Sequence, residues 1–278
     1  MQIIDGKAMA EKIRAEVRTG AVEFQKKHGR RAGLAVVLVG DNPASEIYIN
    51  LKTKSFADAN MELFLYRLDT FVNDADIIKL VKQLNTEPTV DGILVQQPLP
   101  DHLNTPLIVN TVAPNKDVDG LTKPSPFTPC TPLGCLEMIR ACFPQSKDNP
   151  LAGLHAVVVG RSNIVGRPMA RLLLDNDCTV TVCHSKTVDL KSYTKTADIL
   201  VVAVGKPKLI TAPMVKKGAI VIDVGINRTP DGAICGDVDF PNVSPITSHI
   251  SPVPNGVGPM TIAILLKNTL ASGNCNAR

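Results

Sequence analysis

A tyrosine and a lysine four residues apart, Tyr48 and Lys52, form a pair whose types and spacing suit acid–base chemistry. On a helix, residues at this spacing lie on one face. A lysine amine that loses water beside an apolar wall has its pKa lowered, so it can donate and accept protons near neutral pH. Lys52 is therefore a candidate general acid and base. The alternative is an ordinary solvated lysine on a helix surface.

Two further polar positions lie where a parallel sheet would present ligand-binding groups. Gln96 follows the apolar run GILV, and the carboxyl ends of strands in open parallel sheets carry such groups. Asp119 lies further on, in the irregular segment KDVDG. A carboxylate there can accept paired hydrogen bonds from an amino-pyrimidine-like edge. Asp117 fits this role equally well, and either carboxylate could instead cap the turn.

A glycine-rich turn is the second feature that could do chemistry. The apolar run HAVVV leads into GRSNIVGRPM, which places Gly160, Ser162, Gly166 and Pro168 between a predicted strand and a predicted helix. Glycine lets the backbone approach a pyrophosphate, and the free N–H groups at the helix start favour its negative charge. The pattern predicts a dinucleotide-binding loop. The alternative is a strand-to-helix turn that uses glycine only for its geometry.

The end of the next predicted strand indicates which dinucleotide binds. An NAD site places Asp or Glu there to hold the ribose 2′-hydroxyl, whereas TVTVC is followed by His184, Ser185, Lys186 and Thr187. A 2′-phosphate would meet a hydroxyl, a cation and, from the glycine turn, Arg161, with no carboxylate to repel it. NADP is therefore favoured over NAD. The alternative is a solvated strand end with a chance basic residue.

The elements that must position these residues alternate between helices and strands. Helical and strand-like runs follow one another over 6–29, 34–40, 43–60, 61–68, 73–85 and part of 90–100, and after a helical run over 131–143 the rhythm resumes at residue 155. Such alternation predicts parallel sheets with crossover helices. The proline-rich stretch 101–132 separates two lobes. We predict an α/β protein with two mostly parallel sheets, the C-terminal lobe being Rossmann-like.

Length, composition and charge restrict the classes of protein that are possible. The chain has 278 residues, 44% hydrophobic and 20% charged, which suits about two globular domains. Its net charge of +4 is too small and dispersed for nucleic-acid binding, and no apolar run reaches the roughly 18 residues of a membrane span. The N-terminus lacks the order of a signal peptide. Seven cysteines without a CxxC pair argue against disulfides and zinc and indicate a reducing compartment.

With these residues assembled, the sequence resembles the bifunctional methylenetetrahydrofolate dehydrogenase/cyclohydrolase family over nearly its full length. The resemblance rests on DNPASEIYINLK, DGILVQQPLP, NKDVDGL, PCTPLG, VVVGRSNIVGRPM, CHSKT, IVIDVGIN and PVPNGVGPMT, in family order. It implies NADP-dependent oxidation of 5,10-methylenetetrahydrofolate to the 5,10-methenyl cation, and then hydrolysis to 10-formyltetrahydrofolate. It also implies a cytoplasmic homodimer linked to purine biosynthesis. The implied domains are a folate-binding catalytic domain over 1–140, an NADP-binding Rossmann domain over 141–256, and a helix over about 257–272 that packs on the first.

The resemblance also implies a role for each matching residue. Lys52 would be the main acid and base of the hydrolytic step, with Gln96 adjusting its protonation. Tyr48 would stack on the aromatic part of the folate and orient Lys52, and Asp119 would hold the pterin. The other implied contacts are Ser45, Pro98 and Leu99 at the folate, Gly160, Arg161, Ser162, Gly166, Pro168 and Ser185 at the cofactor phosphates, and Ile226 at the nicotinamide half. No metal ligand is required, and one cleft between the lobes would serve both steps.

Two residues depart from the usual family pattern, and two alternative functions remain. Gln97 stands where an apolar residue usually precedes PLP, which affects the pocket's shape, and Asn255 replaces a glycine of PVPGGVGP. Asparagine tolerates left-handed backbone angles, so we expect that turn to survive. One alternative is a monofunctional dehydrogenase, against which Lys52 argues. The other is a non-catalytic NADP-binding regulator, which has no reason to retain Lys52, Gln96 and Asp119 together.

Overall fold

The structure, a computed structural model, describes residues 1–144, 149–229 and 232–276, with all side chains in these ranges except those of Pro43 and Ala44. The chain packs as two units, each built from two stretches. Unit 1 comprises Met1–Ala10 and Thr131–Thr261, and unit 2 comprises Glu11–Cys130 and Ile262–Arg278. Both main sheets consist of parallel strands, which confirms the predicted α/β fold class. The boundaries of the functional domains stay a prediction.

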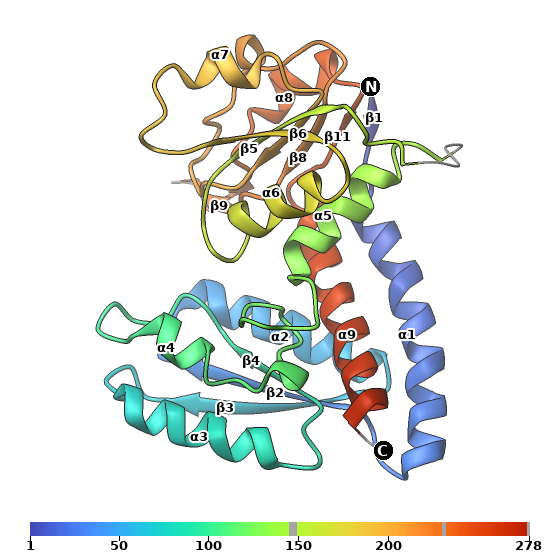
Figure 1. Ribbon diagram of the computed structural model, residues 1–278, viewed down its shortest axis with the longest axis vertical. Coiled ribbons are helices and arrows are strands. Elements are labelled where there is room, and N and C mark those ends of the chain that lie inside the picture. The colour runs from blue at the N-terminus through green and yellow to red at the C-terminus, as the bar shows by residue number, and fades with distance from the viewer. Residues whose placement is uncertain (145–148, 230–231, 277–278) are drawn as a thin grey trace. The chain divides into compact units, whose positions relative to one another are not determined.

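Unit 2 is built around a three-stranded sheet with strand order β3-β2-β4. Its strands and shorter helices are β2 (Gly33–Val39), α2 (Pro43–Asp58), β3 (Glu62–Leu68), α3 (Asp74–Thr86), β4 (Gly92–Val95), α4 (Thr105–Val109) and the 3₁₀ turn η1 (Pro114–Lys116). In Figure 1, α3 and α4 lie on one face of this sheet and α2 on the other. All seven residues of β2 are buried, because the central strand is covered on both faces, and this explains its unbroken apolar sequence.

Helix α3 shows how local signals and packing agree in unit 2. The side chain of Asn73 caps its start by accepting a hydrogen bond from the backbone N–H of Asp76 at 3.0 Å. Its apolar stripe, Ile77, Val81 and Leu84, is buried against the sheet, and each such side chain contributes about 1.5–3 kcal/mol on burial. This packing covers the face of the sheet opposite α2 and includes Ile93 and Val95 of β4. It therefore holds β4 in place just before the segment that follows it.

Unit 1 contains a six-stranded parallel sheet in the order β1-β11-β8-β7-β5-β6. Its strands are β1 (Gln2–Ile3), β5 (His155–Val159), β6 (Thr179–Cys183), β7 (Ile199–Val202), β8 (Ile220–Asp223) and β11 (His249–Ile250), and β9 (Asn227–Arg228) pairs with β10 (Ile234–Cys235) in a separate hairpin. Val159 is in register with both Cys183 and Val202. The carboxyl ends of β6, β5 and β7 therefore lie side by side, which brings together the segments that follow them.

The remaining helices complete the two units (Figure 1). They are α1 (Gly6–His28), α5 (Cys130–Arg140), α6 (Gly166–Leu174), α7 (Leu190–Thr194), α8 (Phe240–Val243) and α9 (Val257–Asn276), with the 3₁₀ turns η2 (Ala212–Met214) and η3 (Ser244–Ile246). Within unit 2, α9 is joined to loops by hydrogen bonds. The Ser272 hydroxyl is 2.6 Å from the carbonyl oxygens of both Asp91 and Asn115, and the Asn268 amide donates to the Val118 carbonyl at 2.9 Å.

The short elements are where the structure adds to the sequence prediction. Strands β1, β9, β10 and β11 have two residues each, too few to show alternation of apolar and polar residues, and β1 pairs with β11 from nearly the other end of the chain.

Other expectations from the sequence concern single residues and composition. Asn255, which replaces a glycine of the usual pattern, adopts a left-handed φ of +76°, as expected. All seven cysteines are free thiols. Among the described residues, no helix combines the length and apolar character needed to cross a membrane.

Candidate active site

The first group of candidate residues lies on one face of α2. Ser45, Tyr48 and Lys52 are spaced three and four residues apart, so they share a side of the helix, while Ile47 and Leu51 on the other side are exposed. Ser45 and Lys52 are buried, Lys52 being only 6% exposed, and Tyr48 is half-buried. Lys52 is therefore not the solvated surface lysine of the alternative interpretation.

Lys52 meets Gln96 across the carboxyl edge of the unit 2 sheet. The Lys52 Nζ donates a hydrogen bond to Gln96 Oε1 at 2.7 Å. Gln96 directly follows β4, and its backbone N–H pairs with the Val37 carbonyl of β2 at 2.9 Å. Its side-chain Nε2 donates to the carbonyl of Gln97 at 2.7 Å. The amide is thus held at both ends, which aims its oxygen at the lysine.

The burial of Lys52 favours its neutral form. Burial lowers the pKa of Lys52, and the nearby Asp119 and Cys130 oppose this shift. An amine with a lowered pKa is partly unprotonated nearer neutral pH, so it can accept a proton from water and return it. The hydrogen bond to Gln96 holds that amine in one orientation.

The structure separates the roles of the two candidate aspartates. Asp117 is buried and holds a turn: its carboxylate accepts hydrogen bonds from the backbone and hydroxyl of Thr122 at 2.7 and 2.8 Å, and from the Gly120 N–H at 3.1 Å. Burial raises the pKa of Asp119, which the charge of Lys52 opposes. The two charges are close enough to influence each other, and we keep Asp119 as the proposed pterin ligand.

Cys130 belongs to the same group, although its thiol was not among the predicted site residues. Its Sγ donates to the Val118 carbonyl at 3.3 Å, and burial together with the nearby charge of Asp119 raises the pKa of this thiol well above its usual range. Lys52 and Cys130 are 78 positions apart in the printed sequence, so no local spacing could have joined them.

The segment after Gln96 places its side chains in different surroundings. Pro98 is exposed, Gln97 is half-buried and Leu99 is buried. Leu99 packs in the apolar core that α3 and α4 share with the sheet. Any effect of Leu99 on a folate pocket would therefore come from holding this backbone in place.

In unit 1 the glycine turn has the close packing that its sequence predicts. A Cβ atom on Gly160, whose φ is +125°, would lie 2.2 Å from the Ala203 carbonyl oxygen, and one on Gly166 would lie 2.2 Å from the Gly160 carbonyl oxygen. Only glycine fits at either position. The Ser162 hydroxyl accepts hydrogen bonds from the N–H groups of Val165 and Gly166 at 3.1 and 3.3 Å, which fixes the turn against the start of α6.

The segments beside this turn carry the remaining cofactor candidates. Arg161, Ser185 and Lys186 are exposed, Pro168 is half-buried at the start of α6, and Ile226 is 48% exposed after β8. Residues 184–187 form a tight turn in which the His184 N–H donates to Thr187 Oγ1 at 2.8 Å. Because this turn and the glycine turn follow adjacent strands, a 2′-phosphate bound there can reach groups on both turns.

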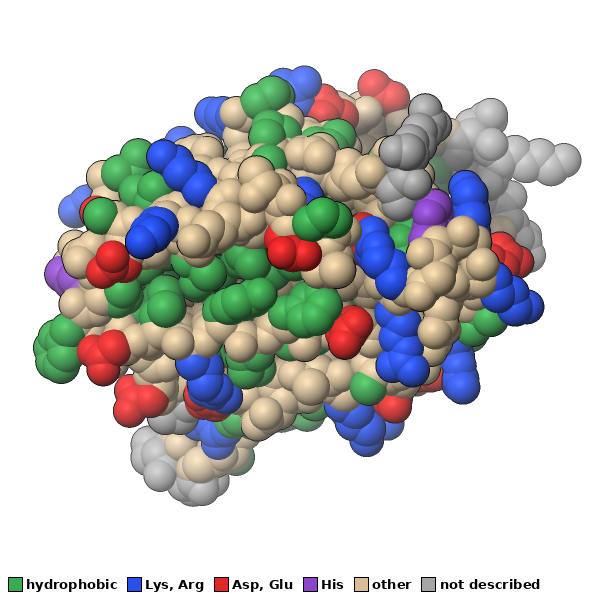
Figure 2. All heavy atoms as spheres, turned by 90° about the horizontal axis from the view of Figure 1, so that it is seen from below, with side chains coloured by type: hydrophobic (Ala, Val, Ile, Leu, Met, Phe, Trp, Pro, Cys, Tyr) green, Lys and Arg blue, Asp and Glu red, His purple; other side chains and the backbone are tan. Residues whose placement is uncertain are grey.

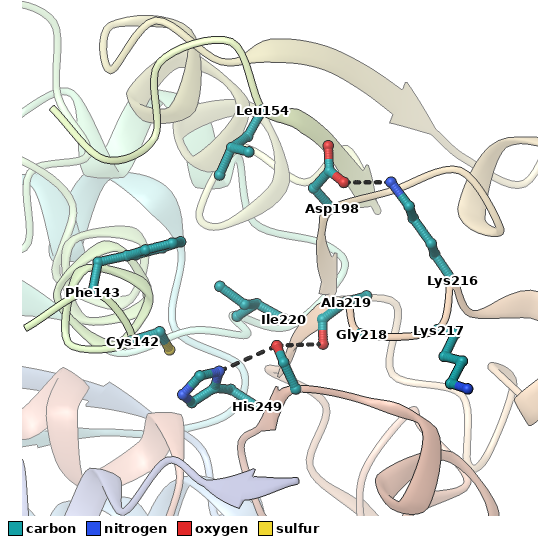
Figure 3. Close-up of a pocket in the computed structure, with 11 residues that line it drawn as sticks. Cys142, Phe143, Leu154, Asp198, Lys216, Lys217, Gly218, Ala219, Ile220 and His249 are labelled. Carbon is teal, nitrogen blue, oxygen red and sulfur yellow. Dashed lines mark hydrogen bonds and ion pairs between the residues drawn. The ribbon is translucent and has the colours of Figure 1, made fainter. Parts of the chain in front are cut away.

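A hollow of about 250 Å³ in unit 1 lies at the other ends of the strands. It is lined by the residues that precede or begin β5, β7, β8 and β11, among them Leu154, Asp198, Ile220 and His249 (Figure 3). At its rim, Asp198 and Lys216 form an ion pair at 2.5 Å. Parallel sheets bind cofactors at the carboxyl ends of their strands, so this hollow is separate from the glycine turn.

Metal-binding groups are not gathered at either candidate site. In residues 1–144, 149–229 and 232–276, no three or more His, Cys, Asp or Glu side chains are clustered as metal ligands would be.

Comparison with known proteins identifies the family. Residues 4–119 match the family described as tetrahydrofolate dehydrogenase/cyclohydrolase, catalytic domain, and residues 129–277 match its NAD(P)-binding domain. The chain belongs to the tetrahydrofolate dehydrogenase/cyclohydrolase family. It is 48% identical over 278 residues to the bifunctional protein FolD of Paracidovorax citrulli, covering 97% of this chain and 96% of that protein.

Solved structures agree with this membership. The bifunctional enzyme FolD of Campylobacter jejuni is 45% identical, with 99% of each chain covered and a TM-score of 0.94. A Trypanosoma brucei methylenetetrahydrofolate dehydrogenase-cyclohydrolase complexed with NADP cofactor and inhibitor is 34% identical, with 99% of this chain and 98% of that chain covered and a TM-score of 0.92. The family resemblance, the Rossmann-like lobe, the enzymatic assignment and the nicotinamide cofactor are confirmed, and the bifunctional interpretation is supported over both alternatives. The roles of individual residues stay predictions.

Proposed function

We propose that this tetrahydrofolate dehydrogenase/cyclohydrolase oxidises 5,10-methylenetetrahydrofolate with NADP and then hydrolyses the methenyl product to 10-formyltetrahydrofolate. The observation that carries the hydrolytic half is the buried amine of Lys52, held at 2.7 Å from Gln96 and beside Asp119. A purely NADP-binding regulator would have no use for this arrangement.

The oxidation needs alignment more than proton transfer. The methylene carbon lies between two nitrogens, so loss of a hydride leaves a cation stabilised by both lone pairs, and the hydride passes to the nicotinamide ring of NADP. No proton leaves in this step, so a general base is not needed. The part of the protein is to fix the two reactants, which we assign to the folate group on α2 and the glycine turn before α6.

Hydrolysis does need a group that handles protons. Water adds to the methenyl carbon while neutral Lys52 accepts one of its protons. The bond from this carbon to N5 then breaks as the Lys52 ammonium returns the proton to N5. The remaining hydroxyl proton on the carbon is released to solvent as the C=O bond forms, which leaves the formyl group on N10. Gln96 keeps the amine aimed, Asp119 accepts hydrogen bonds from the pterin, and Tyr48 stacks on the aromatic part. Ser45 supports the same face of α2.

The cofactor preference follows from charge at the turn after β6. Residues 184–187 contain no carboxylate, and the exposed Arg161 and Ser185 lie on neighbouring turns. A guanidinium paired with a phosphate makes charge-assisted hydrogen bonds that a ribose hydroxyl cannot replace. We therefore assign Arg161 and Ser185 to the 2′-phosphate, with Gly160, Ser162, Gly166 and Pro168 at the pyrophosphate and Ile226 at the nicotinamide half.

We also propose that the enzyme is a cytoplasmic homodimer whose product feeds purine biosynthesis. Seven free thiols suit a reducing compartment. In the described part of unit 2, β3 pairs only with β2 and leaves one edge open, and an open edge is a template for pairing with another chain. Leu63, Leu65 and Leu68 on this strand are only half-buried. Figure 2, seen from below, the side on which α3 and β3 lie in Figure 1, shows apolar side chains gathered in a band.

The oligomeric state can be tested by light scattering on the eluting full chain. We expect the mass of two chains, and Leu65→Lys should shift it toward one chain, whereas Leu107→Lys, which changes an exposed leucine of α4, should not. A wild-type mass of one chain would refute the dimer.

The function is tested by supplying 5,10-methylenetetrahydrofolate and NADP and following NADPH, methenyl and 10-formyl products separately. NADPH without formyl product would indicate a monofunctional dehydrogenase, and no NADPH would leave only the regulator. Lys52→Met should abolish hydrolysis while NADP binding persists. Lys54→Met, which changes an exposed lysine of the same helix, should leave both reactions unchanged. Hydrolysis that survives in Lys52→Met would remove Lys52 from its proposed role.

A further inference from the structure

Two buried carboxylates in unit 1, Asp223 and Asp237, have no part in the mechanism described so far. Asp223 ends β8 and is 3% exposed, and Asp237, just past β10, is fully buried. Neither forms an ion pair with a lysine or arginine of the described chain. Burying a carboxylate without hydrogen bonds is costly, so the partners of these two groups show what they hold in place.

Asp237 gathers donors from the segments that follow two neighbouring strands. Its Oδ2 accepts hydrogen bonds from the backbone N–H groups of Val204 and Gly205 at 2.7 and 3.0 Å, and its Oδ1 accepts one from the Lys206 N–H at 2.8 Å. Its Oδ1 also accepts a hydrogen bond from the Asn227 side chain at 2.9 Å. Three successive N–H groups form an anion-binding nest, and here an internal carboxylate fills it.

Asp223 in turn fixes the chain that carries Asp237. Its Oδ1 accepts hydrogen bonds from the N–H groups of Asp237 and Gly225 at 2.9 and 3.0 Å, and its Oδ2 accepts one from the Val238 N–H at 2.9 Å. There is no spare room: a Cβ on Gly225 would lie 2.2 Å from Asp237 Oδ1, and one on Gly236 would lie 1.8 Å from Asp223 Oδ2. The two carboxylates are therefore locked in one arrangement.

The segments held in this way lie at the carboxyl edge of the sheet, where the cofactor is proposed to bind. The Ala203 carbonyl abuts Gly160 of the glycine turn, and the next three residues donate to Asp237. Ile226, the proposed contact of the nicotinamide half, is the exposed residue between Gly225 and Asn227. Asp223 accepts a hydrogen bond from Gly225, the residue before Ile226, and Asp237 accepts one from Asn227, the residue after Ile226.

We propose that Asp237, fixed by Asp223, is a positioning residue for hydride transfer, because it ties the turn after β7 to the segment around Ile226 and so holds the surface that orients the nicotinamide ring. The inference rests on the proposed function. Asp237 does not touch the cofactor, since it is fully buried. Its effect is on alignment, to which hydride transfer is sensitive: a displacement of about 1 Å can lower a rate about 100-fold.

Asp237→Asn in the full chain is the direct test. The amide keeps the size of the side chain but turns an NH₂ group toward N–H donors, so one side of the turn is released. We expect kcat of the dehydrogenase to fall about 10–100-fold, while KM for NADP changes less than about threefold. Hydrolysis of 5,10-methenyltetrahydrofolate, supplied directly, should stay at the wild-type rate because it needs no dinucleotide. Asp239→Asn, two residues away and without a contact to the turn, is the matched control.

A kinetic isotope effect separates positioning from general loss of structure. With substrate deuterated at the transferred position, the isotope effect on kcat should rise in Asp237→Asn, because hydride transfer becomes the slow step. An unchanged kcat, or a raised KM with unchanged kcat, would overturn the proposal. If Asp237→Asn loses both activities, a milder variant, Asn227→Ala, is measured instead. This variant removes one of the four hydrogen bonds that the Asp237 carboxylate accepts, and a wild-type kcat in Asn227→Ala would also overturn the proposal. Failure of the wild-type enzyme to make NADPH would instead refute the proposed function.

Discussion

Replacing Gln96 by glutamate would place a negative charge directly beside the amine that hydrolysis depends on. The Gln96 Oε1 lies 2.7 Å from Lys52 Nζ, and both groups are held by the edge of the sheet and by α2. The glutamate is nearly the same size as the glutamine, so the change is one of charge. It should raise the pKa of Lys52, which burial otherwise lowers.

The size of the effect follows from the distance. Two unit charges 2.7 Å apart attract by about 6 kcal/mol at an effective dielectric constant of about 20, which corresponds to roughly 4 pKa units. Lys52 would then stay protonated throughout the neutral range. Hydrolysis at pH 7 should fall at least about 100-fold and recover only as the pH rises, whereas oxidation by NADP should persist because it needs no base.

The assay is the rate of methenyl hydrolysis from pH 6 to 10, beside NADPH formation at each pH. Gln83→Glu, on the exposed side of α3, adds the same charge away from the site and should match the wild type. A pH profile of Gln96→Glu that superimposes on that of the wild type would show that the protonation of Lys52 does not limit hydrolysis, and the mechanism would fail with it.

Three further changes test other parts of the molecule. Arg161→Ala should weaken NADP binding about 10–100-fold, from lost hydrogen bonds worth about 1.5–3 kcal/mol, and leave NAD nearly unaffected in titration calorimetry; equal losses would contradict the 2′-phosphate assignment. Arg30→Ala removes two hydrogen bonds, at 2.7 and 2.8 Å, from the carboxylate of Asp91, whose side chain is 1% exposed, and leaves it only the one from the Gly33 N–H. Urea denaturation should therefore show a loss of about 3 kcal/mol, against under about 0.5 kcal/mol for Arg14→Ala, which breaks a surface pair with Glu11. Burial raises the pKa of Asp223 to about 7, so between the ordinary pKa of an aspartate and pH 7 the folded protein keeps a proton that the unfolded chain has lost. The stability of the wild type should therefore fall as the pH rises toward 7, and Asp223→Asn should flatten this slope. Equal slopes in the two proteins would contradict the raised pKa.

The parts of the site that follow strand ends could be predicted from the sequence. Apolar runs and the 3.6-residue period place Lys52 on a helix and Gln96 after a strand, and the rule that ligands meet the carboxyl edge of a parallel sheet brings them together. The glycine turn is equally local, because Gly160 and Gly166 lie within one strand-to-helix connection and their need for space is independent of the rest of the chain.

Contacts made by distant segments could not be predicted in this way. Cys130 reaches Asp119 and Lys52 through the path of the loop before α5, and nothing in PCTP indicates it. Asp237 meets the turn after β7 from more than 30 residues away, and an aspartate in a polar segment is ordinarily a solvated one. Leu99 shows the same limit, since a side chain that follows a strand can enter the core or face a pocket, and only packing decides which.

The division of each unit into two stretches of chain has a consequence for synthesis on the ribosome. Residues 11–130 emerge early, but the carbonyl oxygens of Asp91, Asn115 and Val118 receive their hydrogen bonds from Ser272 and Asn268. The early part of unit 2, which contains Lys52, must therefore wait without α9 while the whole dinucleotide-binding stretch is translated. A nascent chain halted before residue 262 should be cut by protease at sites that the finished enzyme protects, and chaperones would meet this half first.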